Sequence, residues 1–238
     1  MAASPGAERR ARLQALTDEI TVCRRCPRLV EWRERVAREK VARFRSETYW
    51  GRPVPGFGDP DARILLVGLA PAANGGNRTG RVFTGDASGD FLFAAMYEVG
   101  LANQATSTHV GDGLRLSDTY VAAAVRCAPP ANKPLPSERD NCAPFLALEL
   151  AILDRVRVLV GLGSYGWEAA LRAVGSVAGD EAVPRPRPKF GHGAEARVGP
   201  YTLVGTYHPS QQNTFTGKLT RPMLDMVLAR AADLAAGG

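Results

Sequence analysis

The stretch VGLAPAANGGNRTGRVFTGDASGD, residues 67–90, is the part of this chain from which the fold can be worked out. A short apolar run, Ile64–Val67, leads directly into it, and glycine recurs throughout the stretch. Such a run is typical of a buried strand, and glycine lets the backbone approach a ligand closely. In open α/β sheets, ligands bind where strands end in loops. The stretch therefore predicts a buried strand followed by a ligand-binding loop.

The composition is that of a globular chain. Of its 238 residues, 45% are hydrophobic and 23% charged, which is enough apolar surface for a sizeable core. No apolar run approaches the roughly 18 residues of a membrane helix, and the N-terminus lacks the apolar segment of a secretory signal. We expect a cytoplasmic protein with no membrane partner. We also expect one domain over residues 1–238, in which residues 1–60 form a basic N-terminal extension.

The charge balance favours a polyanionic partner. The net charge is +6, and arginines crowd into the first fifth of the chain. Clustered arginine is typical of nucleic-acid-binding proteins. The alternative is that the high arginine content, like the high alanine and glycine content of this chain, only reflects a GC-rich genome.

Short apolar runs alternate with segments of helical spacing along the chain. Strands are expected at residues 62–67, 119–125, 156–161 and 201–206. Helices are expected at residues 9–22, 28–45, 88–100, 137–153, 164–174 and 220–236, and Ser88 is the expected N-cap of the third. This alternation predicts an α/β fold with a mostly parallel sheet that helices cover on both faces.

Four cysteines form a possible ligand set: the pair Cys23-x-x-Cys26, then Cys127 and Cys142. In a reducing compartment such a set indicates metal binding or redox chemistry rather than disulfides. Iron–sulfur clusters and zinc both accept four cysteines, and the residues alone leave that choice open, although the lack of a second C-x-x-C disfavours a zinc ribbon. Free cysteine also occurs as a small buried apolar residue.

One histidine stands out from the other two. His208 directly follows the fourth expected strand, whereas His109 and His192 lie in polar, glycine-rich loops and are expected at the surface. Parallel strands place their carboxyl ends at one edge of a sheet. Phe83 and Asp86, from the loop after the first strand, are therefore predicted to face the same cleft as His208.

Three motifs together resemble the uracil-DNA glycosylases, specifically family 5, the B-type enzymes. They are GLAPA at 68–72, RTGRVFTGD at 78–86 and HPSxxN at 208–213, and they occur with the four cysteines over most of the chain, roughly residues 23–217. The resemblance implies a monomeric three-layer α/β/α sandwich around a short, mostly parallel four-stranded sheet. It further implies a structural [4Fe–4S] cluster on the metal ligands Cys23, Cys26, Cys127 and Cys142.

The implied activity is DNA repair by base excision. The enzyme would flip a damaged base out of DNA and hydrolyse its N-glycosidic bond, leaving an abasic site. It would be nucleoid-associated when acting. The resemblance assigns His208 to stabilising the leaving base and Phe83 to stacking on it. The remaining implied contacts are Gly68, Ala70 and Asn213 for the substrate, and Ser210 and Gln212, on a loop that enters the DNA helix in this family. Arg78, Arg81 and Lys218 are candidate phosphate contacts, and the alternative for each is an ordinary solvated surface charge.

The chain departs from related families in two places. Leu69 and Ala70 occupy the positions where sister families carry a catalytic Asp, Asn or Glu, and this absence is typical of the B-type enzymes. Asp86 is therefore our first choice for positioning water or stabilising the oxocarbenium ion, and Asp90 the second. Residues 121–125, VAAAV, lack the asparagine with which related enzymes read the base. We expect weaker discrimination, extending to deaminated purines such as hypoxanthine.

Two other classes of function remain open at this stage. One is a non-catalytic iron–sulfur DNA-binding module, which the missing motif carboxylate supports. The other is an iron–sulfur redox protein, which would need no His208.

Overall fold

The computed structural model describes residues 4–237 and contains a six-stranded sheet. The strands are β1 (Phe57–Gly58), β2 (Ile64–Gly68), β3 (Thr119–Ala123), β4 (Val158–Leu162), β5 (Glu195–Val198) and β6 (Tyr201–Thr206). Their order is β1-β3-β2-β4-β6-β5; the four middle strands are parallel, and both edge strands are antiparallel. The four expected strands are present, so the α/β fold is confirmed. The expected number of four strands is wrong.

Both unexpected strands lie at the edges of the sheet, in segments rich in proline and glycine. β1 is only two residues long, and the first three residues of β5 are not buried. Edge strands of this kind carry no apolar run, because only one side of their backbone pairs and little of their side-chain surface enters the core.

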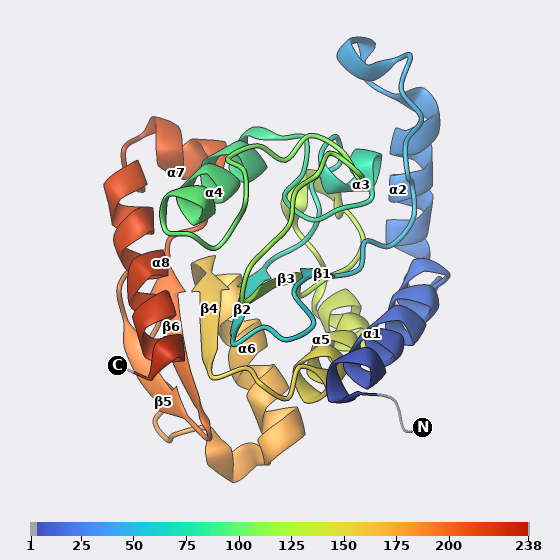
Figure 1. The fold of residues 1–238 in the computed structure, drawn as a ribbon. Coiled ribbons are helices and arrows are strands. Elements are labelled where there is room, and N and C mark those ends of the chain that lie inside the picture. The colour runs from blue at the N-terminus through green and yellow to red at the C-terminus, as the bar shows by residue number, and fades with distance from the viewer. Residues whose placement is uncertain (1–3, 238) are drawn as a thin grey trace.

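Helices cover both faces of the sheet (Figure 1). The α-helices are α1 (Pro5–Thr21), α2 (Pro27–Glu39), α3 (Gly76–Thr79), α4 (Ala87–Glu98), α5 (Pro136–Ile152), α6 (Gly163–Ala178), α7 (Gln211–Phe215) and α8 (Arg221–Ala236). One core cluster joins the sheet to α1, α5 and α6, and a second joins its other face to α4 and α8. The central strands are fully buried between these layers, which explains their uninterrupted apolar sequences. Within the described chain, no helix is long and apolar enough to cross a membrane.

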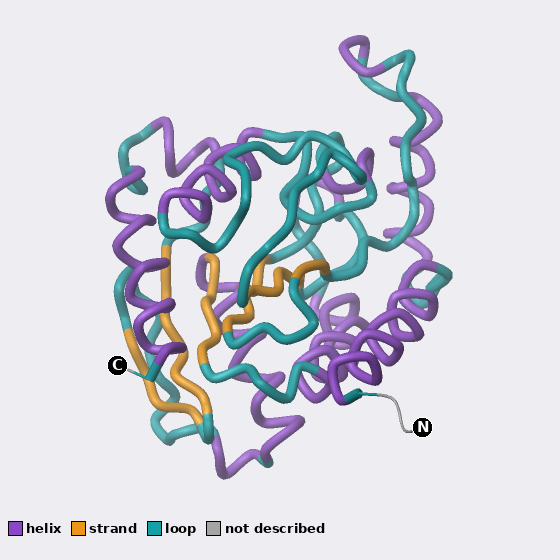
Figure 2. Tube along the Cα trace, viewed as in Figure 1, coloured by secondary structure: helices purple, strands orange, loops and turns teal. Residues whose placement is uncertain are grey.

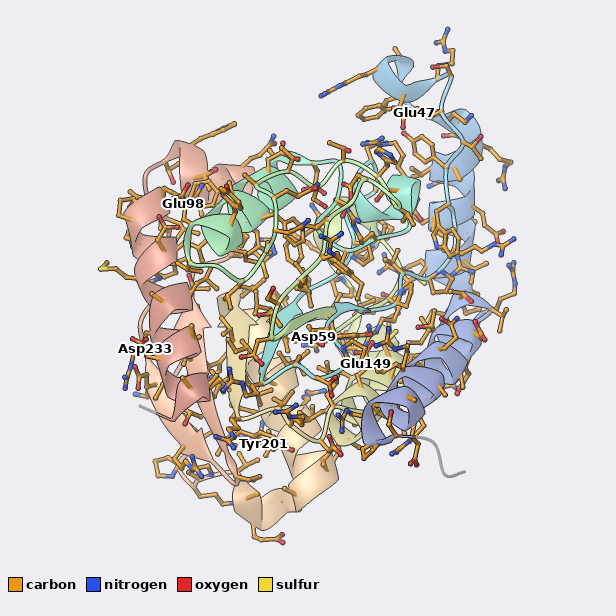
Figure 3. All side chains as sticks on the ribbon, viewed as in Figure 1. Glu47, Asp59, Glu98, Glu149, Tyr201 and Asp233 are labelled. Atoms are coloured by element: carbon orange, nitrogen blue, oxygen red, sulfur yellow. The ribbon has the colours of Figure 1, made fainter. Side chains whose placement is uncertain are left out.

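The second helix ends earlier than expected. It was predicted to reach residue 45, but α2 stops at Glu39 because Lys40 has a φ of 51°, outside the helical region. A 3-10 helix, Ala42–Phe44, follows. In Figure 1 the end of α2 and this turn project beyond the rest of the molecule, and Glu47 lies at the base of the projection (Figure 3). We call residues 40–47 the arm.

The loops that matter for function are gathered beyond one end of the sheet (Figure 2). β2, β4 and β6 are parallel, so Gly68, Leu162 and Thr206 all end at that edge. The segments that leave these three residues therefore come close together although they lie far apart in sequence.

Candidate active site

The segments after β2, β4 and β6 enclose a cavity of about 590 Å³ at the carboxyl edge of the sheet. This volume falls within the roughly 300–1,000 Å³ of small-molecule sites. Phe83, Asp86 and His208 all line it, as predicted, and so do Ala70 and Asn213. The cavity thus collects aromatic, acidic and imidazole side chains from loops separated by more than a hundred residues.

Phe83 is held in an uncommon backbone conformation. Its φ is 50°, in the left-handed region that non-glycine residues seldom adopt and that costs of order 1–3 kcal/mol. A Cβ atom on Gly68 would come within 2.8 Å of the Phe83 ring, so glycine at the end of β2 lets this ring lie against the strand. The sequence at these two positions therefore places an aromatic face at the cavity.

His208 stands next to Phe83. Their ring centroids are 5.8 Å apart, with the ring planes tilted by 36°. Burial lowers the pKa of His208 to about 4, so the imidazole is neutral near pH 7. Asn213 donates its side-chain amide to the backbone carbonyl of His208 at 2.9 Å, which fixes the turn that presents the ring. A neutral imidazole donates one N–H and accepts at its other nitrogen.

Asp86 has a second role that the sequence analysis missed. It is the N-cap of α4, and its Oδ1 accepts a hydrogen bond from the Gly89 N–H at 3.0 Å. We expected Ser88 in that position. Burial raises the pKa of Asp86 above its ordinary value, while the N–H groups of Gly89 and Ser88 oppose that rise. The carboxylate is therefore fixed in place by the helix that it caps.

The second candidate carboxylate lies elsewhere. Asp90 is exposed and lines a neighbouring cleft of about 940 Å³, but not the cavity that holds His208. Asp86 lines both spaces. The geometry therefore favours Asp86 over Asp90.

Comparison with known proteins agrees with this geometry. Residues 55–232 match the model of the uracil DNA glycosylase superfamily. The chain belongs to this superfamily. The Type-5 uracil-DNA glycosylase of Thermus thermophilus is 52% identical, over 93% of this chain and 98% of that protein. Those of Mycobacterium bovis and Mycobacterium leprae are 51% and 49% identical, over 91% and 92% of this chain and 79% and 94% of those proteins.

We expected Arg78 and Arg81 to contact DNA from the protein surface, but the structure places neither at the surface. Arg78 and Arg81 are both buried. Arg78 pairs with Glu47 and donates to the carbonyl of Gly85 at 2.8 Å, and Arg81 pairs with Asp112 at 2.7 Å. Both charges are paired inside the protein, where they brace the loop that carries Phe83 and Asp86.

The segment after His208 forms the short helix α7. Ser210 is its N-cap, accepting a hydrogen bond from the Asn213 N–H, and Ser210, Gln212 and Asn213 all line the cavity. Lys218 is exposed at the same cavity. Gln212 and Lys218 are thus accessible, whereas Ser210 and Asn213 also have structural hydrogen bonds.

A further histidine lies close to the site and was wrongly expected at the surface. His192 is partly buried, and burial lowers its pKa. Its ring stacks on Tyr207, which lines the cavity, at a centroid distance of 5.1 Å, and its Nδ1 accepts the Tyr207 N–H at 3.4 Å. The pairing of β5 with β6 creates this contact, and no local motif indicates it. His109 is exposed, as predicted.

The four cysteines of this superfamily member lie around one small cavity between α2, the segment after β3 and the start of α5. All are free, and Cys26, Cys127 and Cys142 are buried in one cluster. Arg33 donates to the Sγ of Cys127 at 3.0 Å. Among residues 4–237, however, no group of three or more Cys, His, Asp or Glu side chains is arranged to hold a single metal ion. The four thiols therefore lie around one cavity, as the sequence indicated. The metal centre itself remains a prediction.

Proposed function

We propose that this protein is a monofunctional uracil-DNA glycosylase that hydrolyses the N-glycosidic bond of uracil in DNA and leaves an abasic site. The observation that carries the proposal is the pairing of Phe83 and His208 at 5.8 Å in a cavity that Asp86 also lines. Membership of the superfamily and relatives named Type-5 uracil-DNA glycosylase, about 50% identical, support it. Such an enzyme acts on the nucleoid in the cytoplasm, and we expect a monomer.

The base must leave the duplex before it can reach this cavity, since its glycosidic bond is inaccessible inside the helix. Phe83 offers a ring face on which the flipped base stacks, a contact worth about 1–3 kcal/mol. Uracil paired with guanine is a favourable target because a mismatched base costs less to unpair.

Bond cleavage leaves negative charge on the base and positive charge on the sugar. His208, neutral near pH 7, donates an N–H to the developing anion of the base. A fixed donor of this kind contributes about 3–4 kcal/mol to the transition state. The Asp86 carboxylate, held by its N-cap hydrogen bond, stabilises the oxocarbenium ion and orients the attacking water.

The thiols of Cys23, Cys26, Cys127 and Cys142 would hold a [4Fe–4S] cluster with a structural role. A four-iron cluster binds each thiolate through a different iron, so its sulfurs lie farther apart than the four ligands of a zinc ion, which must all lie about 2.3 Å from one point. This difference suits four cysteines that surround one cavity without forming a single-ion site. When bound, the cluster would join α2 to the segment after β3.

DNA contacts are proposed for two surfaces, one on α7 beside the cavity that holds Phe83 and His208, and one on the arm. On α7, Phe215 has 80% of its surface exposed, which makes it a candidate apolar wedge between base steps, next to Gln212 and Lys218. On the arm, Arg43 and Arg45 are exposed and take the phosphate-binding role that buried Arg78 and Arg81 cannot fill.

The ends of β2 and β3 give the pocket no amide side chain with which to read a base. Leu69 and Ala70 line it, and the buried strand β3 ends in alanines. We therefore propose that hypoxanthine is also excised, because sites without a buried amide discriminate weakly. A panel of duplexes, each with one modified base, measures this breadth, and cleavage of uracil alone would contradict it.

The deciding experiment is abasic-site formation on uracil-containing duplex DNA. The intact protein should cleave, and His208→Ala and Asp86→Asn should each be strongly impaired while still binding DNA. Binding without cleavage by the intact protein would instead favour the non-catalytic DNA-binding alternative.

A further inference from the structure

Arg33 is a buried cation in α2, and its neighbours are the proposed metal ligands. Only 2% of its surface is exposed. Its Nη1 donates to the Sγ of Cys127 at 3.0 Å and its Nη2 to the backbone carbonyl of Cys23 at 3.3 Å. Its buried Nε has no hydrogen-bond partner among the described residues. Both contacts of this guanidinium are therefore to residues of the four-cysteine cavity.

The other buried arginines all have a carboxylate partner. Arg126 pairs with Glu149, which is labelled in Figure 3. Arg9, Arg78 and Arg81 also form ion pairs with Asp or Glu. Within residues 4–237, Arg33 has no carboxylate oxygen within 4.0 Å, and the adjacent Glu34 pairs with Arg24. Arg33 is thus the exception within the described core.

A guanidinium removed from water without an anion is strongly unfavourable, because its hydration is lost and no attraction replaces it. Such a residue is expected where an anion will be present in the working protein. Four cysteines bind a metal centre as thiolates, and this gives the cavity the negative charge that it otherwise lacks.

We propose that Arg33 is a buried counter-charge of the metal–thiolate centre, a positioning residue that retains the cluster and raises its reduction potential. This inference rests on the cluster in the proposed function. Arg126 also lines the cysteine cavity, but its charge is already paired with Glu149. Removal of a positive charge next to the centre disfavours the more negative, reduced form, so the midpoint potential must fall when the charge is lost. Loss of the hydrogen bond to Cys127 must also speed the release of iron.

The same residue also contacts the segment between β2 and α4, which carries Phe83 and Asp86. The backbone carbonyl of Arg33 accepts the side-chain amide of Asn77 at 3.3 Å, and Asn77 is fully buried in α3. Gly75, just before α3, packs so closely on Asp86 that a Cβ would lie 1.9 Å from its Oδ2. One residue of α2 therefore connects the cysteine cavity to the loop behind Asp86.

The test compares Arg33→Met, which removes the charge, with Arg33→Lys, which keeps it, in protein isolated with its metal centre. Measurements are iron and sulfide per chain, the rate of iron loss to a chelator, and the midpoint potential. We expect Arg33→Met to lose iron roughly 10- to 100-fold faster, the scale of changes around metal ligands, and to have a lower potential. Arg33→Lys should lie between it and the wild type. Arg38→Met, an exposed change on the same helix, is the matched control and should behave as wild type.

Wild-type values for Arg33→Met, or equal defects in the Lys and Met variants, would overturn the role of Arg33 while leaving the glycosylase proposal intact. Absence of iron and sulfide from the wild-type protein would overturn both this role and the cluster assignment, and the excision assay separates that result from loss of function. If Arg33→Met does not fold, Arg33→Gln compared with Arg33→Lys makes the same test of charge.

Discussion

Asp86 combines two functions in one side chain, and the two can be separated by substitution. Asparagine is as good an N-cap as aspartate, so Asp86→Asn should keep the free energy of unfolding within about 0.5 kcal/mol of wild type, whereas Asp86→Ala should lose about 1 kcal/mol. Both should lower the single-turnover excision rate by at least roughly 10²-fold, because both remove the charge. The measurements are chemical denaturation and abasic-site formation.

Asp90→Asn provides the control, since Asp90 is exposed and absent from the base cavity. Excision at the wild-type rate by Asp86→Asn, together with a slow Asp90→Asn, would reverse the assignment of the two carboxylates.

The depressed pKa of His208 makes a prediction about pH. An ordinary histidine gains its proton as the pH falls through about 6.5. With its pKa lowered to about 4, His208 gains its proton only as the pH falls through about 4, so it stays neutral throughout the range from 5 to 8. His208 should therefore contribute no inflection to the single-turnover rate between pH 6 and 7. An inflection there that disappears in His208→Gln would show that the imidazole titrates normally.

At the scale of elements, the end of β2 is shaped to receive Phe83. In Gly68→Ala the new Cβ would collide with the ring, so kcat/KM should fall by roughly tenfold or more as about 1–3 kcal/mol of base stacking is lost. Gly100→Ala is the control variant. The φ of Gly100, 77°, strains alanine, but the new Cβ has no atom within 4 Å and disturbs no contact. It should lower stability by about 1 kcal/mol and leave kcat/KM unchanged. Wild-type kcat/KM in Gly68→Ala would contradict the role of this contact.

The elements that could be predicted from sequence were those with a strong apolar signal. The four buried strands were found because they are short, uninterrupted apolar runs, and the long helices because their apolar residues recur at helical spacing. β5 was missed because its pairing depends on backbone groups in an exposed segment. Ser88 was mistaken for the cap of α4 because Ser and Asp cap equally well.

In the candidate site, too, some residues could be placed from the sequence and others could not. Phe83, Asp86 and His208 could be placed together because parallel strands end at one edge. The positions of Arg78, Arg81 and His192 could not be predicted, since a charged or imidazole side chain gives no local sign of burial. Their partners, such as Asp112 and Tyr207, are brought to them only by the tertiary fold.

At the scale of the whole molecule, the arm extends the basic surface beyond the body. Its contribution to DNA binding can be measured from the dependence of the binding constant on salt concentration. Each phosphate contact contributes about 0.9 to the slope of log K against log salt concentration. Arg43→Ala/Arg45→Ala should therefore reduce the magnitude of this slope by up to about 2 for a uracil-containing duplex. The double variant Arg10→Ala/Arg12→Ala removes equal charge from α1, which lies away from the arm in Figure 1, and should change it little. Equal slopes for the two double variants would exclude the arm from the DNA interface.

The four-cysteine cavity is assembled from distant parts of the chain, and this affects the order of events during synthesis. Cys23 and Cys26 leave the ribosome early, whereas Cys142 follows only after more than half of the chain has been made. At about 5–20 residues per second, the first pair waits on the order of ten seconds for the second. During that interval a cluster delivered to the nascent chain would find half of its ligands. The proposed cluster would therefore be inserted late, once the segment after β3 has supplied Cys127 and α5 has supplied Cys142.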